Sequence, residues 1–126
     1  MATQDDVRRI AMQFPGVQAA EDGFAFSVPN RKTRNGFVWA WMERIDPKKS
    51  KVPSREVIAV SVRNLTEKEL LLASDPVKFF TEPHYNGFPA VLVRLGAIAA
   101  DELEDVLLEA WKCKAAALQI EEFEKS

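Results

Sequence analysis

The chain has 126 residues, 47% of them hydrophobic and 29% charged, so it can bury one core but is too short for two domains. Seventeen Lys and Arg residues against nineteen Asp and Glu residues leave a formal net charge of −2, which excludes a uniformly basic surface. A single Cys and a single His exclude an internal disulfide and the usual Cys/His zinc site, and we expect no cofactor.

The N-terminal segment is polar, and no stretch of the chain reaches the ~20 consecutive apolar residues of a membrane-spanning helix. We therefore expect a cytoplasmic protein with no signal peptide and no membrane partner. The chain is predicted to form a single domain over residues 1–126, with a flexible tail from about residue 119.

The first predicted element is an amphipathic helix near the N-terminus. Thr3 is a candidate N-cap, and Asp6 three residues later suits a capping box. The helix is expected to stop at Pro15-Gly16. Its apolar face repeats at helical spacing and consists of Val7, Ile10, Ala11 and Phe14.

Three antiparallel strands are predicted next, within residues 24–28, 37–45 and 57–62, with basic connections between them. In the second strand the period of two places Phe37, Trp39 and Trp41 on one face and Val38, Ala40 and Met42 on the other. Core packing of the aromatic face is one interpretation. The alternative is an outward aromatic face that stacks bases or holds a ligand beside the basic loops.

The second half of the chain predicts a short helix, a strand and a long helix. Thr66 and Glu69 suit a capping box for the short helix, and Val91 to Leu95 form the strand. Helical spacing then runs from Leu103 through Leu118. The fold class is α+β: an antiparallel sheet of four to five strands, with the N-terminal and long C-terminal helices on one face.

Positive charge is concentrated in the predicted hairpins. Residues 31–55 hold eight basic and two acidic residues, a local charge of +6 against −8 for the rest of the chain. Such asymmetry favours contact with a polyanion, although basic loops also keep sheet edges from pairing. The candidate nucleic-acid contacts are Arg31, Lys32, Arg34, Lys48, Lys49, Lys51 and Arg55.

A second cluster of polar residues lies between Pro83 and Gly87. The imidazole, phenol and amide of His84, Tyr85 and Asn86, together with Arg94, define a candidate ligand pocket with Trp111 as a wall. A structural turn explains the same residues without a ligand. No nucleophile elbow or Gly-rich phosphate loop is present in the sequence, so we expect no enzyme and no catalytic residues.

Residues 79–95 read FFTEPHYNGFPAVLVRL, and this segment resembles the MmcQ/YjbR family of small bacterial proteins. The matching signature is an aromatic pair, then Thr-x-Pro-His-Tyr-x-Gly-aromatic-Pro and Val-Leu-Val-Arg-Leu. The resemblance implies a compact α+β domain with two projecting hairpins, called a double wing, that is similar to secretion-chaperone folds; it also implies DNA binding. Other matching segments, in the same order, are Phe14-Pro15-Gly16-Val17, Ala25-Phe26, Asp75-Pro76 and Glu109-Ala110-Trp111.

The chain departs from the family pattern in two places. The basic segment from Lys48 to Arg55 is longer, and Asn86 stands where a basic residue is common. We predict a non-enzymatic module that binds DNA mainly through phosphate contacts, with little sequence specificity. The alternative is a module that binds a small anionic ligand or a protein through His84, Tyr85 and Arg94. No particular oligomeric state is predicted.

Overall fold

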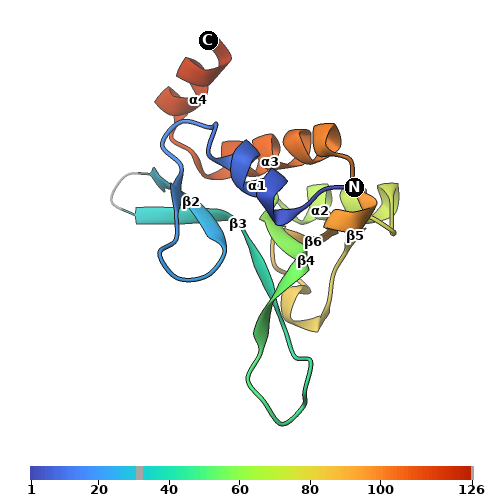
Figure 1. The fold of residues 1–126 in the computed structure, drawn as a ribbon. Coiled ribbons are helices and arrows are strands. Elements are labelled where there is room, and N and C mark those ends of the chain that lie inside the picture. The colour runs from blue at the N-terminus through green and yellow to red at the C-terminus, as the bar shows by residue number, and fades with distance from the viewer. Residues whose placement is uncertain (31–32, 126) are drawn as a thin grey trace.

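The computed structural model describes residues 1–30 and 33–125 as an α+β fold built on one sheet (Figure 1). The sheet has six antiparallel strands in the order β1-β2-β3-β4-β6-β5. The strands are β1 (Gln18–Ala19), β2 (Ala25–Asn30), β3 (Thr33–Glu43), β4 (Val52–Ser61), β5 (Phe79–Phe80) and β6 (Ala90–Arg94). The α-helices are α1 (Gln4–Ala11), α2 (Leu65–Ser74), α3 (Ala100–Lys114) and α4 (Ala117–Lys125), and the 3-10 helices are η1 (Pro83–Tyr85) and η2 (Leu95–Ala97).

The fold class is as expected, but the sheet has more strands than the four to five predicted. The additional pairings involve β1 and β5, which have two residues each. Two residues are too few to show the alternation that identifies a strand in sequence. None of the helices within residues 1–30 and 33–125 combines the length and the apolar character that a membrane span requires.

Helix α1 begins with the predicted capping box. The Thr3 hydroxyl accepts from the backbone N–H of Asp6 at 3.3 Å, and the Asp6 carboxylate accepts from the backbone N–H of Thr3 at 2.9 Å. Val7, Ile10 and Ala11 are buried, as their spacing predicts. Two otherwise unpaired backbone donors are thus satisfied, and the helix is oriented onto the core.

The core fills the space between one face of the sheet and helices α1 and α3. Phe26, Val38, Val60 and Val93 contribute from the strands, and Trp111 contributes from α3. Residues 81–89 cross the opposite face of the sheet, where Tyr85 bonds to Trp39. The two faces therefore differ in kind, because one is covered by helices and the other by a short irregular segment.

A β-bulge corrects the predicted faces of β3. Ser27 pairs with Gly36 and Phe26 pairs with Val38, so Phe37 is an extra residue on β3. Phe37 and Val38 are both fully buried in the core. The prediction that Phe37 shares a face with Trp39 and Trp41 is therefore wrong, because the bulge breaks the period of two.

The start of α2 differs from the prediction. Asn64, rather than Thr66, is the N-cap, and its side chain accepts from the backbone N–H of Glu67 at 2.9 Å. Both residue types cap helices well. The earlier start allows Leu71 and Leu72 to pack against the core and buries Lys68.

The predicted long C-terminal helix is two helices. Helix α3 ends where the backbone of Ala115 becomes extended, and α4 begins at Ala117. The ring of Phe123 on α4 lies 5.7 Å from Phe14 and 5.4 Å from Trp111, measured between ring centroids. The break thus returns the chain to the core, and residues 117–125, most of them expected in a flexible tail, form a helix.

Candidate nucleic-acid interface

The loop between β3 and β4, residues 44–51, projects from the sheet and is called the arm here (Figure 1). Local bonds order the arm: the Asp46 carboxylate accepts from the backbone N–H of Lys48 at 3.0 Å, and Arg44 donates to the carbonyl of Lys49 at 2.7 Å. Lys48, Lys49 and Lys51 are exposed. Within residues 1–30 and 33–125, none of these lysines forms an ion pair, so their charges face solvent.

The predicted basic residues do not form one patch. Arg34 is exposed near the start of β3, while the arm follows its other end. Arg31 and Lys32 lie outside the described residues. Arg55 is exposed on β4 and lines a different surface hollow together with Arg8 of α1. Because the arm holds Arg44 as well as three lysines, it is the densest basic segment that the structure describes.

A hollow of about 340 Å³ lies at the root of the arm, on the sheet face away from α1 and α3. We call it the aromatic hollow. It brings Lys51 of the arm together with His84 and Tyr85 of the 81–89 segment, although the sequence places these residues in two separate candidate sites. Its lining consists of Trp39, Trp41, Met42, Lys51, Glu82, His84, Tyr85 and Phe88.

Specific contacts hold the rings of the aromatic hollow in place. The indole N–H of Trp39 donates to the Tyr85 hydroxyl at 3.0 Å. The rings of Trp41 and Phe80 pack edge to face, with centroids 6.2 Å apart, and those of Tyr85 and Phe88 do so at 6.0 Å. The outward placement of Trp39 and Trp41 corresponds to the second of the two interpretations left open by the sequence.

Lys68 fastens the 81–89 segment from behind. Its side chain is buried, and its ammonium donates to the carbonyl of Tyr85 and, at 2.9 Å, to the carbonyl of Phe88. Burial lowers the pKa of Lys68. Sequence reasoning missed this residue, because a lysine near the start of a helix normally lies in solvent.

His84 has an exposed side chain and a carboxylate partner. The Glu82 carboxylate accepts from the backbone N–H of His84 at 3.1 Å and lies 3.4 Å from its Nδ1 atom. Asn86 is exposed, and its backbone N–H donates to the carbonyl of Pro83 at 3.4 Å. Of the predicted pocket residues, His84 and Tyr85 thus line the aromatic hollow.

Arg94 and Trp111 lie elsewhere and do not complete the predicted pocket. Arg94 donates to the carbonyls of Pro76 and Val77 at 3.2 and 3.0 Å. Its guanidinium also stacks 3.9 Å from the centroid of the Phe80 ring. Trp111 is fully buried on the core side and donates to the Pro15 carbonyl at 3.2 Å. The expected wall of the pocket is therefore a core residue.

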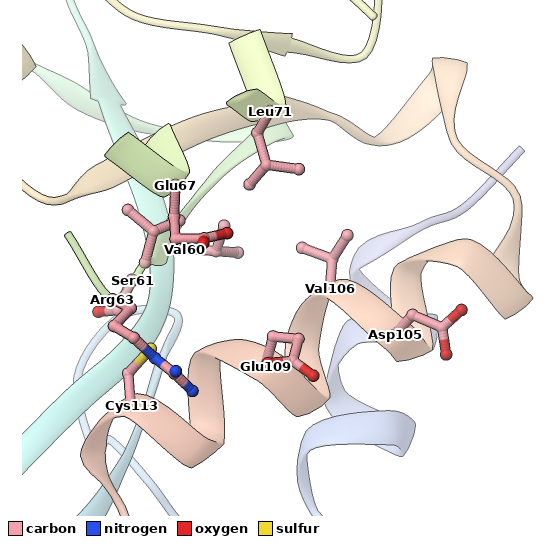
Figure 2. A pocket seen from close by; sticks show the side chains of 10 residues that line it. Val60, Ser61, Arg63, Glu67, Leu71, Asp105, Val106, Glu109 and Cys113 are labelled. Atoms are coloured by element: carbon pink, nitrogen blue, oxygen red, sulfur yellow. The ribbon is translucent and has the colours of Figure 1, made fainter. Parts of the chain in front are cut away.

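A second pocket, of about 370 Å³, lies between α2, the end of β4 and α3 (Figure 2). Its apolar surface includes Val60, Leu71 and Val106. Three acidic residues and one basic residue surround it: Glu67, Asp105, Glu109 and Arg63. Burial raises the pKa of the Cys113 thiol, which keeps it protonated at neutral pH. The sequence showed no signal for this pocket, since its residues come from distant segments.

The fold is that of a small α+β domain with a single antiparallel sheet. It resembles the crystal structure of Deinococcus radiodurans protein DR2400, with a DUF419 domain, at a TM-score of 0.63 and 20% identity, over 88% of this chain and 77% of that one. No family model matches the chain. Uncharacterised proteins of Mycobacterium tuberculosis and Mycobacterium bovis are 37% identical over 123 residues, which cover 91% of this chain and 90% of theirs. The chain belongs to the family of these mycobacterial proteins.

Proposed function

We propose that this chain is a non-enzymatic DNA-binding module that contacts phosphates through the arm. The observation that carries the proposal is the projection of Lys48, Lys49 and Lys51 from the sheet, without ion-pair partners among the described residues. Lysines held on a projecting loop neutralise backbone phosphates and carry little sequence information. We therefore expect weak sequence preference and strong dependence on salt.

The distribution of charge supports approach of DNA from the side of the arm. Glu67, Asp105 and Glu109 line the pocket between α2 and α3, and Arg63 is the single cation among its described lining residues. This side of the described structure repels a polyanion, while the arm attracts one. The Thr-x-Pro-His-Tyr signature in residues 81–85 further supports the resemblance of this chain to the MmcQ/YjbR family. That resemblance implies DNA binding.

The test is the salt dependence of DNA binding. A fluorescent random-sequence DNA duplex should bind with a slope of log affinity against log salt that becomes shallower by about 2.7 when Lys48, Lys49 and Lys51 are all replaced by Ala, since each phosphate contact on a duplex contributes about 0.9. The matched control replaces Lys112, Lys114 and Lys125 of α3 and α4 by Ala and changes the net charge equally. An unchanged slope in the arm variant, or the same loss in both variants, would contradict the proposal.

A second candidate function is binding of a small ligand with a ring and an acidic group. The observation that favours it is the convergence of Lys51, His84 and Tyr85 on the aromatic hollow. Its volume of about 340 Å³ falls within the range of small-molecule sites, about 300–1,000 Å³. Titration with a mononucleotide should shift the indole N–H resonance of Trp39, and His84→Ala should weaken that shift. A mononucleotide that moves no resonance of the hollow would exclude this candidate.

A further inference from the structure

We infer that the preferred ligand is single-stranded DNA, with one unstacked base lying in the aromatic hollow while the lysines of the arm hold the neighbouring phosphates. This inference rests on the DNA-binding function proposed above and adds the form of nucleic acid that the site accepts.

The hollow gathers apolar surface that is open to solvent. Met42 and Phe88 are each 44% exposed, and both line the same hollow as the half-buried rings of Trp39 and Trp41. Exposed apolar side chains scattered singly over a protein need no explanation, whereas a set that converges on one site indicates a binding surface. Aromatic rings next to cationic side chains form the usual platform for unpaired bases.

The rings are oriented before any ligand arrives. Trp39 is fixed by its bond to Tyr85, and Trp41 is fixed by its packing on Phe80. Lys68 holds the carbonyls of Tyr85 and Phe88, so the segment opposite the two tryptophans is also fastened. A base that enters the hollow therefore orders few protein side chains. Less of the favourable stacking energy is then offset by lost side-chain entropy.

The charges separate a place for the base from a place for the phosphates. Glu82 lines the hollow and is bonded to His84, and its carboxylate disfavours a phosphate directly beside it. Lys51 lines the hollow and belongs to the arm, which continues to the exposed Lys48 and Lys49. A neutral base inside the hollow is not repelled by the Glu82 carboxylate, and phosphates along the arm are attracted by its lysines.

This arrangement discriminates against a duplex. In double-stranded DNA each base is covered by its neighbours in the stack and joined to its partner, so none reaches a hollow in a protein surface without being extruded. Extrusion requires unstacking and unpairing in a duplex and is least demanding in a single strand. Phosphate contacts alone remain available to duplex DNA, which leads us to expect binding of both forms with a preference for the single strand.

The experiment compares an oligothymidylate with a hairpin duplex of similar length, using anisotropy and intrinsic tryptophan fluorescence. We expect the single strand to bind at least about fivefold more tightly, which is the low end for one base stacked on an aromatic ring. The single strand should also quench the fluorescence of Trp39 and Trp41. Trp111 is fully buried in the core and supplies an unquenched background.

Two variants and a control complete the test. Trp41→Ala and Phe88→Ala should each lower single-strand affinity about fivefold or more and leave duplex affinity unchanged, which also verifies that the variants are folded. Leu118→Ala on α4, where the side chain is 73% exposed, should change neither affinity. Equal affinity for the two forms, with both variants unaffected, would overturn the inference and leave the phosphate-binding proposal standing. Failure of both forms to bind would overturn both.

Discussion

The hydroxyl of Tyr85 accepts a hydrogen bond from the indole N–H of Trp39 at 3.0 Å, across 46 residues of sequence. This bond joins strand β3 to the 3-10 helix η1. The bond is part-buried, and within residues 1–30 and 33–125 it is the one hydrogen bond of both the indole N–H and the phenol, so removing either group leaves the other without that partner. One hydrogen bond thus fixes the distance between the sheet and the segment that forms the far side of the aromatic hollow.

Tyr85→Phe should lower the free energy of unfolding by about 1 kcal/mol, because it removes the acceptor of the Trp39 indole and leaves a part-buried donor unpaired. Urea unfolding measures the change. Trp39→Phe is the companion variant. The double variant should lose less free energy of unfolding than the sum of the losses of the two single variants. Strict additivity would mean that the bond contributes nothing to stability.

Lys68→Met removes a buried ammonium and keeps most of the apolar stem. Because burial lowers the pKa of Lys68, the folded protein releases this proton at a lower pH than the unfolded chain, whose lysine pKa is about 10.5. Relative to the neutral amine, the buried ammonium is therefore the less favourable form of Lys68 in the folded protein at every pH below the folded pKa. This cost diminishes as the pH rises through the folded pKa toward 10.5.

The free energy of unfolding of the wild type should consequently rise relative to that of Lys68→Met over this alkaline interval. Urea titrations of the two proteins at several pH values give the difference directly, and effects of other groups cancel. A difference that stays constant with pH, or falls, would show that the ammonium is not penalised by its burial.

Asp6→Asn tests the capping box of α1 by its response to acid. The pKa of Asp6 is held below 3.8, first by the backbone N–H of Thr3 and then by the side chain of Arg9. The unfolded chain therefore takes up the proton first. The stabilisation by the carboxylate is present above pH 3.8 and is lost as the pH falls through the folded pKa. Acid unfolding of the wild type should show this loss, and Asp6→Asn should lack it.

Trp111 is predicted to behave as a core residue and not as part of a ligand site. Trp111→Ala should lower the free energy of unfolding by about 3–5 kcal/mol, the usual cost of an aromatic truncation in a core. Trp111→Phe preserves more of the contact with Phe14, whose ring centroid is 5.5 Å away, and should remain folded. Its DNA affinity should equal that of the wild type. A selective loss of affinity in the folded Trp111→Phe protein would contradict this placement.

Local features of the chain were predictable because their partners lie within one turn. The Thr3–Asp6 capping box spans three residues, and the buried face of α1 follows from its own periodicity. The basic arm was likewise visible as a run of lysines after Asp46-Pro47. In each case the feature consists of residues that are close together in sequence, so residue type and spacing are enough to predict it.

The aromatic hollow could be recognised only from the tertiary structure. Whether Trp39 and Trp41 face the core or solvent depends on the bulge at Phe37, which arises from pairing with a different strand. The helix cap, the charged arm and the aromatic residues of β3 follow from local sequence alone. Only the folded sheet brought Lys51 and His84 to one hollow and sent Trp111 into the core, because strand register and packing join residues that are distant along the chain.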